Sequence, residues 1–191
     1  MRLVEADVRL HRGRLEIRHL KSAGPLPLLW DRWELTRYRR PWFELDALLE
    51  ATDAATELML DLKGARLTLA DRVAERLRPY LAVRRFTICA RRWALLEPFA
   101  DLPVRRIRSV GSRRQLERLL DGHKDDGAGV VVHARLLDAA VVAELRTIAA
   151  VVLSWPVNTP ERARELLSLG VHGLISDRVE AITPVVAAVR A

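Results

Sequence analysis

The chain has 191 residues, of which 50% are hydrophobic and 30% charged, a composition that fits one globular domain and excludes an intrinsically disordered protein. Its formal net charge of +7 comes almost entirely from arginine, and a basic surface of this kind attracts anions without specifying which. No apolar run approaches the roughly 20 residues of a membrane-spanning helix, no N-terminal secretory pattern is present, and the single cysteine, Cys89, precludes an internal disulfide. We therefore expect one cytoplasmic domain over residues 1–191, with Cys89 as a buried, inert thiol.

The first stretch, residues 3–20, predicts a β-hairpin with a polar cluster. Glu5 and Asp7 are two positions apart on an apolar run, and residues two apart in a strand share a face. A His-Arg-Gly turn at 11–13 precedes an alternating segment that returns His19 towards the two acids. Two carboxylates on one face repel unless a cation or a basic side chain lies between them. These residues indicate a metal and general-acid site, and a plain surface hairpin explains them equally well.

The next elements alternate between loop, helix and strand. Residues 21–38 contain two prolines, Pro25 and Pro27, which exclude a helix interior and indicate a loop or lid. Helical spacing follows over 42–55, and 58–64 forms a short apolar strand. Further strands are predicted at 85–90, 104–110, 130–133, 150–155 and 171–176, and helices at 68–80, 93–99, 113–120, 139–147, 159–169 and 179–189.

Strands alternating with helices predict βαβ units, about seven of them, around a parallel sheet. A doubly wound sheet and a barrel both fit this count, but no Gly-rich phosphate fingerprint follows any strand. Polar residues gather instead where several strands end, and a barrel places its chemistry at that rim. They are Glu5, Asp7, Asp61, Lys63, His133, Asn158 and Asp177. We expect an α/β protein of the TIM-type (β/α) barrel class.

Residues 153–177, LSWPVNTPERARELLSLGVHGLISD, strongly resemble the closing segment of the glycerophosphodiester phosphodiesterase family, W-T-V-N followed by a helix and G-V-D-G-I-I-T-D. Four earlier segments resemble the same family in the same order: VEADV, EIRH, LMLDLKG and, more weakly, FTICARRWALLEPF. The resemblance covers nearly the whole chain. It implies a TIM barrel that uses Mg²⁺ or Ca²⁺ to hydrolyse glycerophosphodiesters to glycerol 3-phosphate and an alcohol.

The resemblance also implies a role for each matching residue. Glu5 and Asp7 match two metal ligands, and Asp61 stands where a third ligand is normally glutamate. His19 matches one of two catalytic histidines. The residues matching the substrate and phosphate positions are Lys63, Trp155 and Asn158. These roles are chemically sound, because carboxylate oxygens suit both cations and imidazole exchanges protons near neutral pH.

The sequence departs from the family pattern at its start. It contains no strand ending in H-R-G and no P-E-N-T, the segments that supply the other histidine and a further ligand. The triplet 11–13 matches the family's K-D-G turn instead, and Leu20 replaces an aspartate that usually follows the histidine. Either the first strand is missing from this sequence or the chain is a natural short member with seven recognisable strands.

Weak activity, or none, is the expected consequence, since losing one acid/base group typically costs on the order of 10² to 10⁴ in rate. A missing strand leaves residues 3–8 and 171–176 with unpaired edges, which a homodimer could cover. The alternative function is a degenerate, non-catalytic family member that binds a phosphorylated ligand or a protein partner. A nucleic-acid-binding motif is absent, so we expect no nucleic-acid partner.

Overall fold

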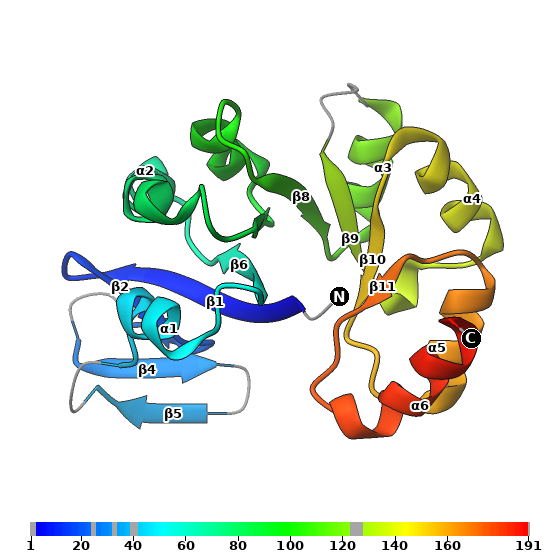
Figure 1. The fold of residues 1–191 in the computed structure, drawn as a ribbon, viewed down its shortest axis with the longest axis horizontal. Coiled ribbons are helices and arrows are strands. Elements are labelled where there is room, and N and C mark those ends of the chain that lie inside the picture. The colour runs from blue at the N-terminus through cyan, green and yellow to red at the C-terminus, as the bar shows by residue number, and fades with distance from the viewer. Residues whose placement is uncertain (1–2, 24–25, 32–33, 39–41, 123–127, 191) are drawn as a thin grey trace. The chain divides into compact units, whose positions relative to one another are not determined.

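The computed structural model describes residues 3–23, 26–31, 34–38, 42–122 and 128–190. The chain divides into two compact units, unit 1 over Met1–Arg105 and unit 2 over Arg106–Ala191 (Figure 1). No helix in the described ranges is long and apolar enough to cross a membrane.

The main sheet of unit 1 has the strand order β2-β1-β6-β7. Strands β1 (Leu3–His11), β6 (Glu57–Leu62) and β7 (Phe86–Ala90) are parallel, and β2 (Arg14–Ile17) returns antiparallel to β1. The two-residue turn between β1 and β2 has positive φ at both positions, +49° at Arg12 and +83° at Gly13, as in the type I′ turns that suit the twist of a hairpin. The predicted hairpin is therefore present, although His11 belongs to β1 rather than to the turn.

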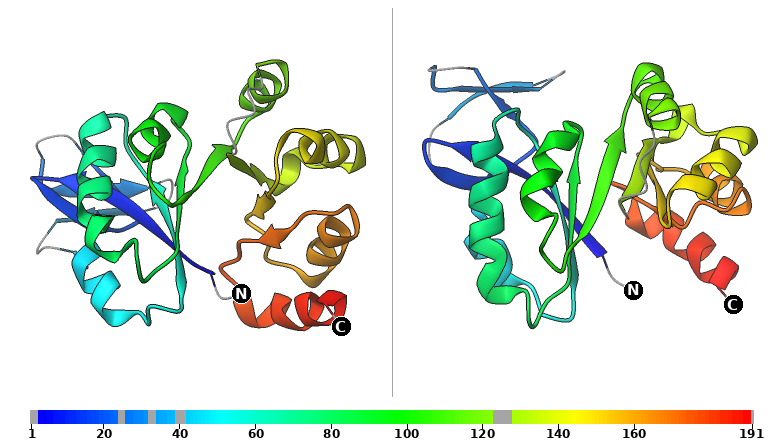
Figure 2. Two further views of the ribbon diagram at one scale, coloured as in Figure 1. Left: turned by 45° about the horizontal axis from the view of Figure 1, so that its top comes forward. Right: turned by 90° about the horizontal axis from the view of Figure 1, so that it is seen from above.

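One face of this sheet packs against helices and forms the hydrophobic core of unit 1. The helices are α1 (Leu45–Ala51), α2 (Leu67–Leu77) with the 3₁₀ turn η1 (Arg78–Tyr80), and the 3₁₀ helix η2 (Trp93–Phe99), which lies beside α2 (Figure 2). The strand residues in this core alternate along each strand, and they are Ala6, Val8, Leu58, Leu60, Leu62, Phe86, Ile88 and Ala90. Because side chains alternate between faces, the residues between them point to the opposite face of the sheet.

A second, three-stranded antiparallel sheet is inserted between β2 and α1, where the sequence predicted an irregular loop. It consists of β3 (Lys21–Ser22), β4 (Leu28–Asp31) and β5 (Glu34–Arg37), and we call it the inserted sheet. The loop prediction was wrong because prolines exclude a helix but not a strand that begins after them. Pro27 lies just before β4, where it does not interrupt the ladder of hydrogen bonds. Pro25, the other proline of that prediction, falls outside the described residues.

A buried ion pair attaches the inserted sheet to the hairpin. Glu16 and Arg18 are almost completely buried, and Arg18 Nε lies 2.6 Å from Glu16 Oε2. Arg18 Nη2 also donates to Ser22 Oγ at 2.8 Å, and the Tyr38 hydroxyl donates to Glu16 Oε1 at 2.6 Å. Ser22 is at the start of the inserted sheet and Tyr38 follows its last strand, so both ends are held by the same pair.

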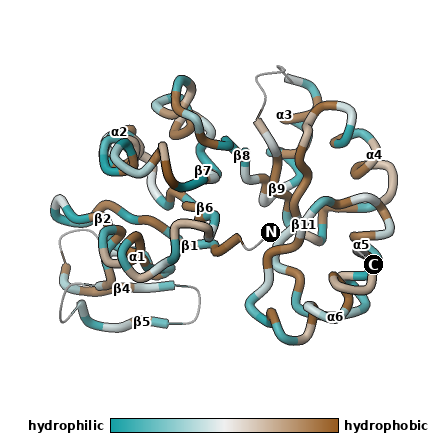
Figure 3. The backbone as a smooth tube through the Cα atoms, in the orientation of Figure 1, coloured by the Kyte–Doolittle hydropathy of each residue, from teal (hydrophilic) through white to brown (hydrophobic). Residues whose placement is uncertain are grey.

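Unit 2 repeats the strand–helix alternation. Its strands are parallel in the order β8 (Arg105–Val110), β9 (Gly129–His133), β10 (Val152–Trp155) and β11 (Gly173–Leu174). Strand β9 is apolar along most of its length and Val130, Val131 and Val132 are buried (Figure 3). The helices are α3 (Arg113–Asp121), the 3₁₀ turn η3 (Ala134–Leu136), α4 (Ala139–Ile148), α5 (Pro160–Ser168) and α6 (Val179–Arg190).

Local signals define the ends of α5. Thr159 caps its N-terminus by accepting from the Arg162 N–H, Pro160 occupies its first position, and Gly170 beyond its end has φ of +94°. The strand that follows is shorter than the predicted 171–176, because β11 keeps regular pairing over two residues only.

Candidate metal centre

Glu5, Asp7 and Asp61 bring one carboxylate oxygen each to within 4.8 Å of one another. Glu5 and Asp7 share a face of β1 because they are two residues apart, and the parallel register pairs Asp7 with Asp61 on β6. These positions lie on the sheet face opposite the helices, Glu5 and Asp7 in the first half and middle of β1 and Asp61 next to the end of β6. We call these three residues the acid cluster.

The acid cluster carries an electrostatic cost. The Glu5 residue is exposed, but protein atoms around its carboxyl remove part of its hydration, and the negative charges of Asp7 and Asp61 add to this effect, so the pKa of Glu5 is raised to about 8. Burial likewise raises the pKa of Asp61 above its ordinary value. Asp61 Oδ1 is buried and has no hydrogen-bond partner among the described residues. A buried carboxylate oxygen without a donor is poorly solvated, which is the state that a bound cation would relieve.

Lys63 already supplies part of the missing positive charge. Its Nζ lies 3.1 Å from Asp7 Oδ1 and also contacts Asp61 Oδ2. Burial lowers the pKa of Lys63, but the Asp61 and Asp7 carboxylates outweigh this effect and raise the pKa to about 12. Lys63 is therefore a permanent cation that faces the Asp7 and Asp61 carboxylates.

His19 contacts the acid cluster directly. Its Nδ1 lies 2.6 Å from Asp7 Oδ2, and its Nε2 lies 3.0 Å from Asp31 Oδ2 on the inserted sheet. The backbone carbonyl of His19 accepts hydrogen bonds from Arg9 Nε at 3.2 Å and Arg9 Nη2 at 3.0 Å. Arg9 Nη1 also donates to the Lys63 carbonyl at 3.1 Å, so one guanidinium fixes the main chain at two residues of the site.

Sequence reasoning missed Arg9 and Asp31. Arg9 carried a usable signal, because it is two residues beyond Asp7 and so faces the same side of β1. Asp31 carried none, since it is 12 positions from His19 and approaches it only through the fold of the inserted sheet.

Trp155 and Asn158, the two other predicted substrate residues, belong to unit 2. Asn158 Oδ1 accepts from the Ser176 hydroxyl at 3.1 Å and the Asp177 N–H at 3.0 Å, which ties the segment after β10 to the segment after β11. The Trp155 ring packs edge-on against His133 with centroids 4.8 Å apart. A place for Trp155 and Asn158 beside the substrate therefore stays a prediction.

The acid cluster fits a hard divalent cation. Mg²⁺ and Ca²⁺ bind carboxylate oxygens, and three such groups from two neighbouring strands converge here, one of them with an unpartnered oxygen. Aspartate at position 61 is one methylene shorter than the glutamate of the family pattern, yet it lies within the cluster.

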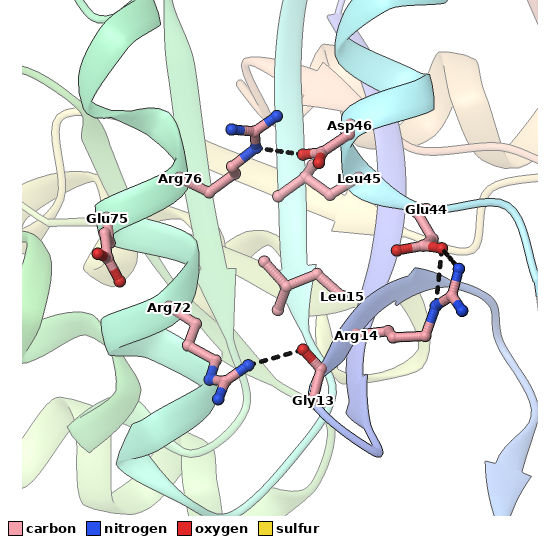
Figure 4. A pocket seen from close by; sticks show the side chains of 9 residues that line it. All are labelled: Gly13, Arg14, Leu15, Glu44, Leu45, Asp46, Arg72, Glu75 and Arg76. Carbon is pink, nitrogen blue, oxygen red and sulfur yellow. Dashed lines mark hydrogen bonds and ion pairs between the residues drawn. The ribbon is translucent and has the colours of Figure 1, made fainter.

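A groove on the helix side of the sheet is separate from this site. It has a volume of about 440 Å³ and lies between the hairpin turn, the start of α1, and α2 (Figure 4). Four of its charged side chains form ion pairs, Arg14 with Glu44 and Arg76 with Asp46, and Arg72 donates to the Gly13 carbonyl. None of the acid cluster, His19 or Lys63 lines it.

The fold and the site together define a class: an α/β protein of the (β/α)-barrel type with three carboxylates on two neighbouring parallel strands and an imidazole in contact with them. No protein-family model matches the sequence, and no curated protein matches it at a significant level. Several solved structures are similar to it in fold.

Several of these structures are described as phosphodiesterases, and two of them illustrate the similarity. A glycerophosphodiester phosphodiesterase from Thermotoga maritima has a TM-score of 0.72 and 19% identity, covering 95% of this chain and 84% of its own. A phosphodiesterase from Oleispira antarctica, in complex with the product sn-glycerol-3-phosphate, has a TM-score of 0.69 and 17% identity, covering 98% of this chain and 85% of its own. The chain therefore has the fold of glycerophosphodiester phosphodiesterases, and the expected TIM-type α/β class is confirmed.

Proposed function

We propose that this protein is a metal-dependent phosphodiester hydrolase of the glycerophosphodiester phosphodiesterase family, converting a glycerophosphodiester to glycerol 3-phosphate and an alcohol. The observation that carries the proposal is the acid cluster with His19 in contact with it, on a fold shared with such enzymes. The glycerol 3-phosphate in the Oleispira antarctica structure supports a small phosphodiester as the ligand class.

Glu5, Asp7 and Asp61 would hold one Mg²⁺ or Ca²⁺ ion. When bound, the ion supplies a Lewis acid that polarises a phosphoryl oxygen. His19 exchanges a proton with the attacking or departing oxygen from the side that faces Asp7. Lys63 offers a fixed positive charge to the phosphate, and a role of Trp155 and Asn158 in substrate binding rests on the family resemblance alone.

Turnover should be slow. Within the described residues, His19 is the one imidazole in contact with the acid cluster, whereas the family pattern pairs two histidines. A single group must then serve both as acid and as base. Absence of the second acid/base group typically lowers the rate by a factor on the order of 10² to 10⁴.

A second candidate function is a non-catalytic protein that binds a phosphorylated ligand or a protein partner. The contacts of Lys63 favour it, because an internal ammonium group already neutralises part of the charge of Asp7 and Asp61. In this case the ligand would bind without being cleaved.

Hydrolysis of glycerophosphocholine with Mg²⁺, with Ca²⁺ and with EDTA tests the proposal. We expect metal-dependent release of glycerol 3-phosphate, and His19→Ala should lower kcat by about 10² to 10⁴. His172→Asn is the matched control, because it removes a histidine of unit 2 and keeps an acceptor for the Val152 N–H. Activity that survives EDTA or His19→Ala contradicts the site assignment. Binding of glycerol 3-phosphate without turnover supports the second function.

We further propose a cytoplasmic location, from the single buried cysteine, and a small-molecule substrate rather than a nucleic acid.

A further inference from the structure

The inserted sheet places Asp31 against the outer side of the His19 ring. Asp31 Oδ2 lies 3.0 Å from Nε2, while Nδ1 on the other side of the ring lies 2.6 Å from Asp7 Oδ2. The His19 side chain is 68% exposed, so packing alone does not fix its orientation. Its ring is held instead between two carboxylates from different sheets.

The orientation of Asp31 follows from the strand that carries it. Leu29 and Asp31 share one face of β4, and Leu29 is 1% exposed, so this face is turned towards the body of unit 1. Trp30, between them, is 41% exposed and points the opposite way, with Lys21 Nζ 4.5 Å from its ring centroid. The register of a three-stranded sheet therefore determines which way the Asp31 carboxylate faces.

The inserted sheet is itself anchored next to His19. Arg18, the residue before His19, donates to Ser22 at the start of the sheet, and Glu16 accepts from Tyr38 at its end. Both members of this ion pair are buried. Lys21 Nζ lies 3.9 Å from Asp31 Oδ1, the oxygen that does not face the ring. These contacts fix the distance between β4 and the end of β2.

We propose that Asp31 is a positioning residue for His19: its carboxylate accepts a hydrogen bond from Nε2–H, so that Nδ1 is the ring nitrogen presented to the acid cluster. An imidazole with one nitrogen bonded to a carboxylate has a defined ring orientation and a defined reactive nitrogen. The consequence for catalysis rests on the proposed function, whereas the orientation of the ring does not.

The first test reads the His19 ring by NMR in the metal-free protein, at a pH where the imidazole is charged and both ring N–H protons are present. We expect two hydrogen-bonded N–H signals, identified by their loss in His19→Gln. Asp31→Ala should remove the Nε2–H signal and leave the Nδ1–H signal. Asp31→Glu should restore the Nε2–H signal at least in part, because it returns a carboxylate on a longer side chain.

The second test is kinetic. Asp31→Ala should lower kcat about 10- to 100-fold, the usual cost of removing a partner that orients a histidine, with KM changed by less than about twofold. Glu34→Ala is the matched control, since Glu34 is the cross-strand neighbour of Asp31 and its loss changes the charge of the inserted sheet equally. We expect wild-type spectra and wild-type kcat from Glu34→Ala.

The outcomes of the two tests separate the positioning role of Asp31 from the proposed hydrolase function. An unchanged Nε2–H signal in Asp31→Ala, or an equal effect of Glu34→Ala, overturns the proposal. If the wild-type protein has no turnover while Asp31→Ala still loses the Nε2–H signal, the positioning role stands and the proposed hydrolase function fails. Asp31→Asn, which has the same size and keeps an acceptor oxygen, provides the folded comparison if Asp31→Ala is unstable, and it should retain a weakened Nε2–H signal.

Discussion

Glu5 is the residue of the acid cluster whose charge depends most on its surroundings. Partial loss of hydration at its carboxyl and the negative charges of Asp7 and Asp61 raise its pKa from 4.5 to about 8. Between these two pH values the Glu5 carboxyl is therefore mostly protonated in the folded protein and mostly ionised in the unfolded chain. The stability of the metal-free protein should then fall as the pH rises through this window, because folding must increasingly force an ionised carboxylate against two others.

Thermal unfolding between about pH 5 and pH 8 tests this sign, because these values span most of the Glu5 window. We expect the melting temperature of the metal-free protein to decrease over this range, and excess Ca²⁺ or Mg²⁺ to stabilise the protein most at the upper end, where the cation replaces the proton. Glu5→Gln should flatten the dependence and weaken the effect of the cation. A melting temperature that rises towards pH 8 in both proteins would show that Glu5 does not govern it.

Much of the site could be predicted residue by residue. Glu5 and Asp7 share a face because of the two-residue period of a strand, and a tight turn suffices to return His19. Asp31 could not be predicted, because its approach to His19 depends on the register of three short strands. The same holds for Glu16 and Arg18, which alternate like ordinary surface residues of a strand yet are buried as a pair.

Among the elements, the inserted sheet depends on one buried ion pair for its attachment. Arg18 makes hydrogen bonds to Glu16, to the Leu20 carbonyl and to Ser22, and all of its partners lie between β2 and the start of the sheet. Removing one member of a buried pair is costly, because the remaining charge is left without a counter-ion in a poorly solvated place.

Arg18→Met should therefore destabilise the protein by about 3–5 kcal/mol, since it leaves the Glu16 carboxylate buried and unpaired. It should also lower kcat, because the inserted sheet no longer holds Asp31 at His19. Arg14→Met, which breaks the more exposed pair with Glu44, serves as the control and should change stability little. Denaturant unfolding measures both variants. Equal midpoints for the two would contradict the anchoring role of Arg18.

Sequence patterns predicted the longer elements better than the shorter ones. The alternation of apolar residues located α2, β6, β7 and most of the later strands and helices within a few residues, since each buries a periodic face. The predicted helix over 42–55 is shorter, with α1 confined to Leu45–Ala51, and the inserted sheet was taken for a loop. Strands of two to four residues offer too few positions for a period to be recognised.

For the whole molecule, the edge of β1 bears on the oligomeric state. Strand β1 pairs with β6 from Leu3 to Val8, whereas its pairing with β2 begins only at Val8. Within the described part of unit 1, the second edge of residues 3–6 is therefore not covered by β2. An uncovered strand edge is a surface on which another chain can pair.

We predict a homodimer that uses this edge. Light scattering across a range of protein concentrations should give a mass that increases towards twice 21.7 kDa, and high salt should not abolish the association because backbone hydrogen bonds and apolar contacts hold it. Leu3→Pro should weaken it, because the Asp7 carbonyl bonds on the β2 side of β1, Leu3 shares that side, and proline cannot donate to a ladder of hydrogen bonds. A constant monomer mass at all concentrations would contradict the prediction.

The sequence by itself determined what depends on neighbouring residues: the alternating strands and helices, the turn at Arg12 and Gly13, the cap of α5, and the common face of Glu5 and Asp7. Only the tertiary structure decided which distant residues meet. The register of β1 on β6 brings Asp61 and Lys63 to Asp7, and the inserted sheet brings Asp31 to His19. The reason is physical: local periodicity fixes the direction of a side chain along its own strand, whereas contacts between strands depend on a register that no local pattern encodes.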